Sequence, residues 1–577
     1  MREEIRIGVY ICWCGNNIAK MVDVEAVSKE MQKLPDVVIS RTYKYMCSDP
    51  GQDLIITDIK EQRLNRVVVA ACSPRIHEST FRKTLSSAGL NPYLFQMANI
   101  REQVSWVHSS REEATLKAVS LVQGAVERVK WHEPLEKRTV EVNPATLIIG
   151  GGISGISAAL EIADAGKQVY LVEKQENMGG KVACIDLTYP HLYSGQQLIH
   201  SKIDQTRSHS NIDVFQNSEV KKISGYIGNF EAEVARNGQE DIELIFGNII
   251  VATGLKTIDA AKVENYQYGK LTDVFTSFEL EEMFLKGKVA KKDGGIPKNV
   301  VIIHCVGSRN TNYHEYCSRT CCMTALKYAN QLRSALPDSN IYQVYSDMRA
   351  IGKACEELYT STAGRDVMFL SFDQQDGMPQ LRKADPEDDC EMLVEMDEKL
   401  SGETIEIPAD MVVLMVGMEG HDEARELGRM TGLSLCGNEF YIEKHPKLDP
   451  VATTTDGVYV VGSCQSPKDI PDSISQAKAA VARILATINV GSVEVEVTTA
   501  VVNEEACCGC QTCVKVCPYT AISFDEEKKI SVVNEILCKG CGTCGSTCPN
   551  GAIRSRHFTD KQILSQIEGL MSIHKPE

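Results

Sequence analysis

Short apolar runs alternate with longer polar segments over the first part of the chain. The runs Ile5–Ile11, Val37–Ser40 and Arg66–Ala71 have the length and composition of buried strands. Between them, Val24–Lys33 and Asp53–Gln62 place apolar residues at helical spacing. Strands that alternate with helices predict a parallel sheet with helices outside it. We therefore expect the chain to begin with a small α/β domain.

The pattern divides the rest of the chain into three further parts. A helical stretch and a charged, proline-containing link end the first domain, and a larger α/β region follows. A change to dense, regularly spaced cysteines marks another domain, and the chain ends in a short amphipathic helix and a frayed end. The expected divisions are residues 1–135, 136–490, 495–556 and a tail at 557–577.

The composition is that of an acidic globular protein. The 577 residues are 43% hydrophobic and 24% charged, with a formal net charge of -17, which argues against a nucleic-acid partner and favours protein partners. The acidic start of the chain does not resemble a secretory signal. The longest apolar stretch, Thr146–Leu160, is broken by glycines and serines. We expect a cytoplasmic protein with no integral membrane segment.

The chain has 22 cysteines, which is a high number for a cytoplasmic protein. Disulfides are rare in that compartment, so clustered thiols indicate metal or redox chemistry. Two runs of C-x2-C-x2-C-x3-C-P begin 31 residues apart, at Cys507 and Cys538. This is the spacing of bacterial ferredoxins, in which the fourth cysteine of each run binds the cluster of the other run.

We therefore expect two [4Fe-4S] clusters in a ferredoxin-like domain. The ligands are Cys507, Cys510, Cys513 and Cys548 for one cluster, and Cys538, Cys541, Cys544 and Cys517 for the other. Cys508 is out of register and is not expected to be a ligand. Zinc ribbons are the alternative, but they use two cysteine pairs for each metal and lack the Cys-Pro ending.

A dinucleotide fingerprint opens the second α/β region. A strand-like run from Thr146 leads into the sequence Gly-Gly-Gly-Ile-Ser-Gly and then into a helical segment, and Glu173 ends the next strand-like run. The glycines allow a pyrophosphate to approach the helix N-terminus, and the acidic residue takes a ribose hydroxyl. The expected contacts are Gly150, Gly152, Ile153, Ser154, Gly155 and Glu173, followed by Lys174, Gly180 and Lys181.

Two later segments indicate that the dinucleotide is FAD. Ile249–Gly254 ends in Ala-Thr-Gly and Thr455–Ser463 ends in Gly-Ser, and both are similar to flavin-contacting segments of thioredoxin-reductase-like disulfide oxidoreductases. That fold usually has Gly-Asp at the second place, so Ser463 alters the contact with the ribityl chain. A helix at Gln476–Leu485 is expected to face the isoalloxazine. The expected contacts here are Ala252, Thr253, Gly254, Gly462, Ser463 and Ile474.

A second dinucleotide site is not expected. The strand Asn299–Ile303 stands where such flavoproteins bind NAD(P)H, but it continues into His-Cys-Val-Gly-Ser-Arg without the glycine fingerprint. A pyrophosphate cannot approach such a turn closely. NAD(P)H is therefore not expected to be a direct substrate.

Four cysteines follow that strand within 18 residues: Cys305, Cys317, Cys321 and Cys322. They form no Cys-x-x-Cys redox pair. Three interpretations remain open: ligands of a further cluster, a thiol relay, or cysteines buried at the start of the helix Met323–Ser334.

Four more cysteines fall at the ends of the first strands. Cys12 and Cys14 end the first strand, Cys47 lies in the loop after the second, and Cys72 ends the third. In a parallel sheet these positions share one edge, where ligands normally bind. We expect a [4Fe-4S] cluster there, and structural or catalytic cysteines are the alternative.

Taken together, these motifs resemble those of the A-type iron–sulfur subunit of CoB–CoM heterodisulfide reductase over nearly the whole chain. The segments that carry the resemblance are Val9–Ile18, Tyr43–Gln52, Val69–Arg75, Cys305–Arg309, Tyr316–Arg319 and Ser466–Ser473. The resemblance implies a homodimeric FAD subunit that works with B- and C-like subunits and with a hydrogenase-linked or flavin-oxidoreductase-linked partner. It also implies electron bifurcation at the flavin, since flavins exchange one or two electrons. The family places a lysine near the flavin, for which Lys353 and Lys468 are candidates.

The chain departs from the family pattern at two places. Full-length members carry an inserted ferredoxin domain after the segment Gly225–Phe230 and a cysteine-rich stretch where this chain has Tyr193–Leu198. The insertion is the expected exit towards ferredoxin, so its absence favours a simpler relay.

Three functions remain to be compared. The first is a partner-dependent electron-transfer subunit with one FAD and about twelve irons, from three [4Fe-4S] clusters. The second is a self-contained NAD(P)H-dependent flavin and iron–sulfur oxidoreductase like the small subunit of glutamate synthase. The third is an assembly scaffold with a vestigial flavin. The missing second fingerprint favours the first.

Overall fold

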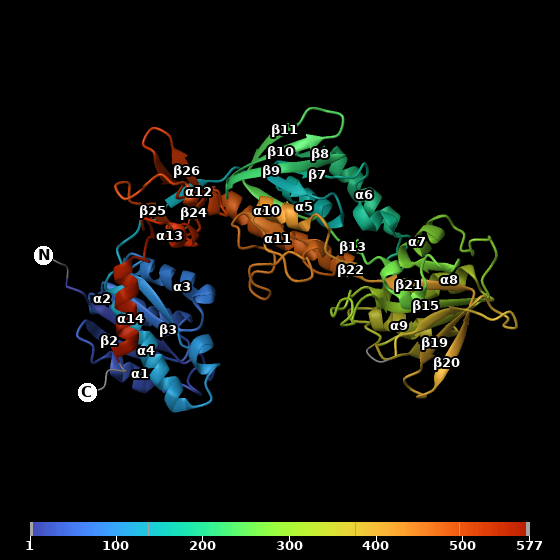
Figure 1. Cartoon of the computed structure of the whole chain (residues 1–577), viewed down its shortest axis with the longest axis horizontal. Coiled ribbons are helices and arrows are strands. Elements are labelled where there is room, and N and C mark those ends of the chain that lie inside the picture. The colour runs from blue at the N-terminus through green and yellow to red at the C-terminus, as the bar shows by residue number, and fades with distance from the viewer. Residues whose placement is uncertain (1–3, 137, 375–376, 496, 573–577) are drawn as a thin grey trace. The chain divides into compact units, whose positions relative to one another are not determined.

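The computed structural model describes residues 4–136, 138–374, 377–495 and 497–572, and it divides the chain into two compact units (Figure 1). One unit combines Met1–Thr139 with Glu494–Glu577, and the other is Val140–Val493. None of the helices in the described ranges is both long and apolar enough to cross a membrane.

The first unit begins with a parallel sheet in the order β2-β1-β3-β4. Its elements are β1 (Ile7–Cys12), α1 (Val24–Met31), β2 (Val37–Tyr43), α2 (Asp49–Glu61), β3 (Arg66–Ala71), α3 (Pro74–Ser87), β4 (Phe95–Asn99) and α4 (Arg111–Val129). Separate apolar cores lie on the two faces of this sheet. Because both faces are covered, β1 and β3 are buried along their whole length. The predicted α/β fold is confirmed.

The second unit contains a five-stranded parallel sheet in the order β23-β12-β6-β7-β8. The strands are β6 (Thr146–Ile149), β7 (Val169–Val172), β8 (Ile212–Phe215), β12 (Asn248–Val251) and β23 (Val458–Val460). Helices α5 (Ile153–Asp164) and α11 (Ile470–Val490) pack on one face. The antiparallel sheet of β9 (Ser218–Tyr226), β10 (Asn229–Arg236) and β11 (Ile242–Phe246) covers the other face.

Helix α11 begins six residues before the predicted start at Gln476. Asp469 caps it, because its Oδ1 accepts a hydrogen bond from the backbone N–H of Asp472 at 2.8 Å. Pro471 stands in the first turn, where its missing N–H has no cost. The sequence-based estimate was wrong here because it started the helix from its apolar spacing rather than from its cap.

A second sheet in the same unit has the order β14-β21-β15-β16-β17. Its strands are β14 (Val274–Thr276), β15 (Asn299–Val306), β16 (Asn340–Tyr345), β17 (Val367–Ser371) and β21 (Met411–Val416). Helices α7 (Ser277–Leu285) and α8 (Cys321–Ala335) pack on one face, and α9 (Cys355–Ala363) packs on α8. The antiparallel strands β18 (Gln380–Lys383), β19 (Met392–Asp397) and β20 (Thr404–Ala409) cover the other face.

The cysteine-rich segment near the end of the chain folds as two similar halves. Strand β25 (Ala500–Val502) pairs with β28 (Ile553–Ser555), and β26 (Ile522–Asp525) pairs with β27 (Ile530–Val533). A one-turn helix stands in each half, α12 (Thr512–Val516) and α13 (Thr543–Thr547). The internal repeat of the sequence therefore corresponds to a repeat in the fold.

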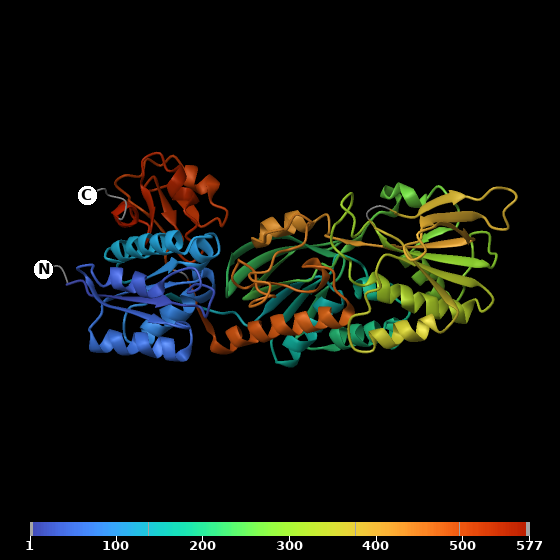
Figure 2. The ribbon, with the colours of Figure 1, turned by 90° about the horizontal axis from the view of Figure 1, so that it is seen from below.

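The last helix, α14 (Asp560–Met571), packs along α4 in the first unit (Figures 1 and 2). Gly124 and Gly569 lie at the crossing, where a Cβ atom on Gly569 would stand 2.9 Å from Gly124 Cα. Arg128 donates to the side chain of Gln566 at 2.9 Å and to the carbonyl of His557 at 2.8 Å. The segment predicted as a tail thus attaches the cysteine-rich domain to the first domain.

Candidate flavin and iron–sulfur sites

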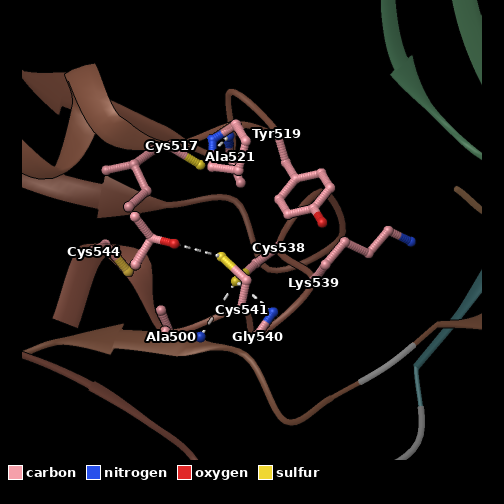
Figure 3. Close-up of a pocket in the computed structure, with 13 residues that line it drawn as sticks. Ala500, Cys517, Tyr519, Ala521, Cys538, Lys539, Gly540, Cys541 and Cys544 are labelled. Atoms are coloured by element: carbon pink, nitrogen blue, oxygen red, sulfur yellow. Dashed lines mark hydrogen bonds between the residues drawn. The ribbon is translucent and has the colours of Figure 1, made fainter. Parts of the chain in front are cut away.

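One pocket of the cysteine-rich domain contains cysteines from both repeats (Figure 3). Cys517 belongs to the first run, and it lines the same pocket as Cys538, Cys541 and Cys544 of the second run. The pKa of Cys544 is raised to about 11, mainly by burial and then by the three other thiols. The fold therefore brings together the four residues predicted to bind the second cluster.

Backbone N–H groups point at the sulfurs of this domain. Ala521 donates to Cys517 Sγ, Ala552 to Cys548 Sγ and Ala500 to Cys538 Sγ, each at 3.3 Å. The contacts of Ala521 and Ala552 are equivalent in the two repeats. Such donors stabilise thiolates bound to iron, and they tune cluster potentials.

The preference for a cluster over zinc rests on the register of the two cysteine runs, which have the ferredoxin spacing and the Cys-Pro ending. Within the described ranges, no group of three or more His, Cys, Asp or Glu side chains is placed to hold a metal ion. Gly540, with φ +61°, lets the loop approach closely, because a Cβ atom there would collide with the carbonyl oxygen of Thr498.

The glycine fingerprint forms the turn between β6 and α5. Gly150 has φ +110°, and a Cβ atom on it would stand 2.5 Å from the carbonyl oxygen of Ala252. A Cβ atom on Gly155 would overlap the carbonyl oxygen of Gly150. By contrast, a Cβ atom on Gly152 would meet no atom within 4 Å. The turn is packed on its inner side and open at Gly152, where a pyrophosphate approaches in this fold.

Glu173 is held at the end of β7, beside the turn. It is only 9% exposed, and its carboxylate accepts hydrogen bonds from the backbone N–H of Gly151 at 2.6 Å and of Gln175 at 2.7 Å. A carboxylate has acceptor positions for about four hydrogen bonds. The remaining positions fit the ribose hydroxyls of a dinucleotide.

The third predicted flavin segment also reaches the fingerprint. Gly462 follows β23 with φ +76°, and a Cβ atom there would overlap the hydroxyl of Ser154 on α5. Its N–H donates to Gln476 Oε1 on α11 at 2.7 Å. Ser463 follows Gly462, and Ile474 lies in the first turns of α11. The three predicted segments therefore meet at the carboxyl edge of one sheet.

The other predicted contacts have different surroundings. Thr253 Oγ1 is buried without a hydrogen-bond partner, between Ala252 and Gly254. Gly180, with φ +56°, begins a short 3-10 helix beside Gly152. Lys181 lies 4.8 Å from the ring centroid of Phe278, and Lys174 pairs with Glu219 and Glu423.

The two candidate lysines differ in burial. Lys468 is partly buried just before α11, and its ammonium donates to Ser466 Oγ at 2.6 Å and to the side chain of Gln465. Burial lowers the pKa of Lys468 to about 8. Lys353 is exposed in the loop before α9.

The four cysteines after β15 are close together. The pKa of Cys321 is raised well above its usual value, first by burial and then by Cys305, Cys322 and Cys317. The pKa of Cys305 is raised to about 12, mainly by burial and then by the charges of Cys322 and Cys317. Cys317 also raises the pKa of Cys322 after burial. Each thiol is therefore within electrostatic range of the other three, as Cys544 is of its neighbours.

These four cysteines, which we call the β15 cysteine group, adjoin the flavin segments. Arg319, two residues after Cys317, pairs with Asp472 in the first turn of α11. The hydroxyl of Tyr266 is fully buried without a hydrogen-bond partner, and burial raises its pKa, with the effect of Cys305 next in size. An unpaired buried donor fits a sulfur acceptor. The group lies at the carboxyl end of β15 in the second sheet.

The cysteines at the ends of β1, β2 and β3 also come together. Cys12 and Cys72 are buried, whereas Cys14 and Cys47 are half-buried. After burial, the charges of Cys14 and Cys47 raise the pKa of Cys12, and Cys14 raises that of Cys47. The backbone N–H groups of Met46 and Cys14 donate to Cys12 Sγ at 3.4 and 3.3 Å. We call these four residues the N-terminal cysteine group.

Sequence reasoning missed Arg101, which faces this group from the loop after β4. Its Nη1 lies 3.6 Å from Cys14 Sγ. The pKa of Cys72 is raised to about 11, mainly by burial, and Arg101 lowers this pKa by more than Glu102 raises it. The sequence signal that could have identified Arg101 was its position just after the fourth strand, at the edge of the sheet that carries the cysteines.

Comparisons with known proteins match the dinucleotide-binding region, the cysteine-rich domain and the chain as a whole. Residues 144–303 match the family model of pyridine nucleotide-disulphide oxidoreductases, and residues 500–555 match that of 4Fe-4S dicluster domains. The chain is 40% identical to the A-type subunit of the H(2):CoB-CoM heterodisulfide,ferredoxin reductase of Methanothermobacter thermautotrophicus, over 99% of this chain and 98% of that protein. It is 38% identical to the A-type iron-sulfur subunit of the CoB--CoM heterodisulfide reductase of Methanocaldococcus jannaschii, over 99% of each.

Two further findings complete the comparison. The alignment with the M. thermautotrophicus protein runs over 654 residues, more than the 577 of this chain, so that relative carries residues that this chain lacks. A solved structure of thioredoxin reductase from T. acidophilum is 18% identical, covers 60% of this chain and 99% of its own, and has a TM-score of 0.41.

Proposed function

We propose that this chain transfers electrons between partner proteins through FAD and [4Fe-4S] clusters. The chain belongs to the family of A-type subunits of CoB–CoM heterodisulfide reductase, and it is an FAD-dependent oxidoreductase. The observation that carries the proposal is the meeting of Cys517 with Cys538, Cys541 and Cys544 in one pocket. Ligands exchanged between two runs bring the two clusters close together, which suits conduction rather than substrate chemistry.

The flavin supplies the exchange between two-electron and one-electron steps when it is bound. The protein contributes the means to hold it: the open turn at Gly152, the α5 N-terminus and the unfilled acceptor positions of Glu173. Lys468 places a cation before α11, where it favours an anionic reduced flavin. These contacts bind and tune the cofactor, and none of them supplies a substrate site.

We propose that the β15 cysteine group also binds a cluster, in addition to the C-terminal domain and the N-terminal cysteine group. Its four thiols lie within electrostatic range of one another, as those around Cys544 do, and Cys305 acts electrostatically on the buried, unpartnered hydroxyl of Tyr266. A cluster there raises the expected iron content from about twelve per chain, which already includes the N-terminal cysteine group, to about sixteen, with four irons for each cluster. The contact of Arg319 with Asp472 joins the β15 cysteine group to the start of α11, which supports electron exchange with the flavin.

The partners follow from the family. Relatives are named as A-type subunits of heterodisulfide reductases, so we propose that this chain works as a homodimer with B- and C-like subunits that reduce a disulfide. A hydrogenase-linked or flavin-oxidoreductase-linked protein would supply the electrons. If the chain bifurcates electrons, the branch to the second acceptor must use the cysteine groups that it retains, because β9 and β10 are joined directly where the inserted domain is expected.

The alternative is an oxidoreductase that takes hydride directly from NAD(P)H. At the end of β15 the structure has buried cysteines instead of a glycine-rich turn. We therefore expect NADH and NADPH not to bleach the flavin of the anaerobic protein, whereas a low-potential one-electron reductant bleaches it. Bleaching by a nicotinamide within seconds would favour the alternative. A flavin that neither reductant bleaches would indicate a scaffold.

A further inference from the structure

The side chain of Arg101 is fixed against the N-terminal cysteine group by several independent contacts. Its Nε and Nη2 donate to Glu102 Oε1 at 3.2 and 2.7 Å, and its Nη1 points to Cys14 Sγ at 3.6 Å. The ring of Trp106 lies 4.7 Å from its Cζ. Only 16% of the side chain is exposed. An exposed surface ion pair would not be held in this way.

The backbone around Arg101 is shaped to hold it. Arg101–Ser105 form one turn of π-helix, a rare conformation that occurs often at functional sites. The side chain of Asn99, at the end of β4, accepts from the N–H groups of Arg101 and Glu102 at 3.2 and 3.0 Å. The turn thereby directs the guanidinium back over the carboxyl edge of the sheet, where the cysteines are.

The pair of Arg101 and Glu102 is oriented with its positive end towards the sulfurs. Glu102 binds Nε and Nη2, whereas Nη1 faces Cys14. The β15 cysteine group has a similar device: Arg309 pairs with Asp347 and places its Nη1 4.0 Å from Cys305 Sγ. In both groups a carboxylate holds an arginine against a cysteine.

We propose that Arg101 is a positioning residue that raises the reduction potential of the N-terminal cluster. This inference rests on the proposed function, because it requires a cluster on Cys12, Cys14, Cys47 and Cys72. One-electron reduction makes a cluster with four thiolate ligands more negative by one charge. A fixed cation beside a ligand sulfur therefore favours the reduced state more than the oxidised state.

The test is a redox titration of the full chain, followed by electron paramagnetic resonance. The N-terminal signal is identified as the one that Cys47→Ala removes. In Arg101→Gln we expect at least a tenfold lower ratio of reduced to oxidised N-terminal cluster at a fixed potential, a shift of about 59 mV for one electron. The other clusters of the same sample should keep their potentials. Arg111→Gln is the matched control, because Arg111 is 61% exposed and pairs with Asp23 at 4.0 Å.

A second variant keeps the test decisive if Arg101→Gln loses the iron of the N-terminal cluster. Arg101→Lys keeps the charge but loses the planar fork that binds Glu102 and Cys14 together, so its potential should fall by less than that of Arg101→Gln. Unchanged N-terminal potentials in the iron-replete variants would overturn the inference. If Cys47→Ala removes no signal from the wild-type spectrum, the N-terminal cluster is absent. That outcome is distinct, and it overturns both the assignment of this cluster and the role of Arg101.

Discussion

Cysteines of the same run have different surroundings. Cys517 and Cys508 belong to one run, yet Cys517 lines a pocket with Cys538, Cys541 and Cys544 of the other run, whereas Cys508 is not part of that lining. The fixed register of the ferredoxin pattern predicts Cys517 as a ligand and Cys508 as a non-ligand. For Arg101 the sequence offered only its position after the fourth strand, and for Tyr266 it offered no signal, since the fold decides which side chain faces a sulfur.

The first prediction compares these two cysteines. We expect Cys517→Ala to lower the iron content by up to about four atoms per chain, because a [4Fe-4S] cluster loses its fourth ligand. The resonance signal of one cluster should change or disappear. Cys508→Ala should keep the iron content and the spectrum of the wild type. Equal iron loss in both variants would contradict the assignment of ligands.

The second prediction concerns the charge of Lys468. Burial lowers the pKa of Lys468 to about 8, so its ammonium is charged below this pH and loses its proton above it. If this cation stabilises anionic reduced flavin, the flavin potential falls more steeply with pH above about 8 than below. Lys468→Met should remove this extra dependence and lower the potential at pH 7. Spectroelectrochemistry measures the flavin potential of this variant and of Lys353→Met, which replaces the exposed candidate lysine. A change in the flavin potential of Lys353→Met alone would contradict the role of Lys468.

At the scale of elements, helix and strand periodicity predicted the layers, and caps and turns decided their ends. The unbroken apolar runs became strands because helices cover both faces of the sheet. Helix α11 began earlier than predicted because Asp469 and Pro471 start it. The packing of α14 on α4 could not be predicted, since it joins segments more than 400 positions apart through glycines that have no local signature.

The third prediction uses the openness of the fingerprint turn. Gly152 has φ -78°, and a Cβ atom there meets nothing in the protein, so Gly152→Val should fold normally but block the pyrophosphate. We expect its flavin content to fall by at least about tenfold, since a misplaced phosphate contact costs more than ~1.4 kcal/mol. The iron content should remain. Gly437→Val, at another open glycine, should retain the flavin. Flavin retention in Gly152→Val would contradict the proposed FAD site.

The fourth prediction concerns the crossing of α14 and α4. A side chain on Gly569 would meet the carbonyl oxygen of Gln123 at 2.9 Å, and overpacking of this kind costs roughly 1–3 kcal/mol. We expect Gly569→Val to increase hydrogen exchange in α14 by about tenfold or more. Leu564→Val, at a position that is 58% exposed, should exchange like the wild type. Equal protection in the two variants would show that the crossing does not hold α14.

At the scale of the whole molecule, the chain contains one flavin fold and several cysteine groups. The C-terminal cluster motifs and the N-terminal cysteine group belong to one compact unit, and the flavin segments and the β15 cysteine group to the other. The sequence predicted the cofactors of each domain from motifs. It left the β15 cysteine group undecided, because only folding shows that four thiols from a strand end, a loop and a helix start share one place.

We propose a flavin protein with cysteine groups for electron transfer in both units, and anaerobic determination of iron and flavin in the purified chain tests this proposal. We expect one FAD and about sixteen irons per chain, from two C-terminal clusters and one cluster on each of the two other groups. About twelve irons would rule out a cluster on one of these two groups, and about eight would rule out both. A purified chain without FAD, at any iron content, would overturn the proposed function.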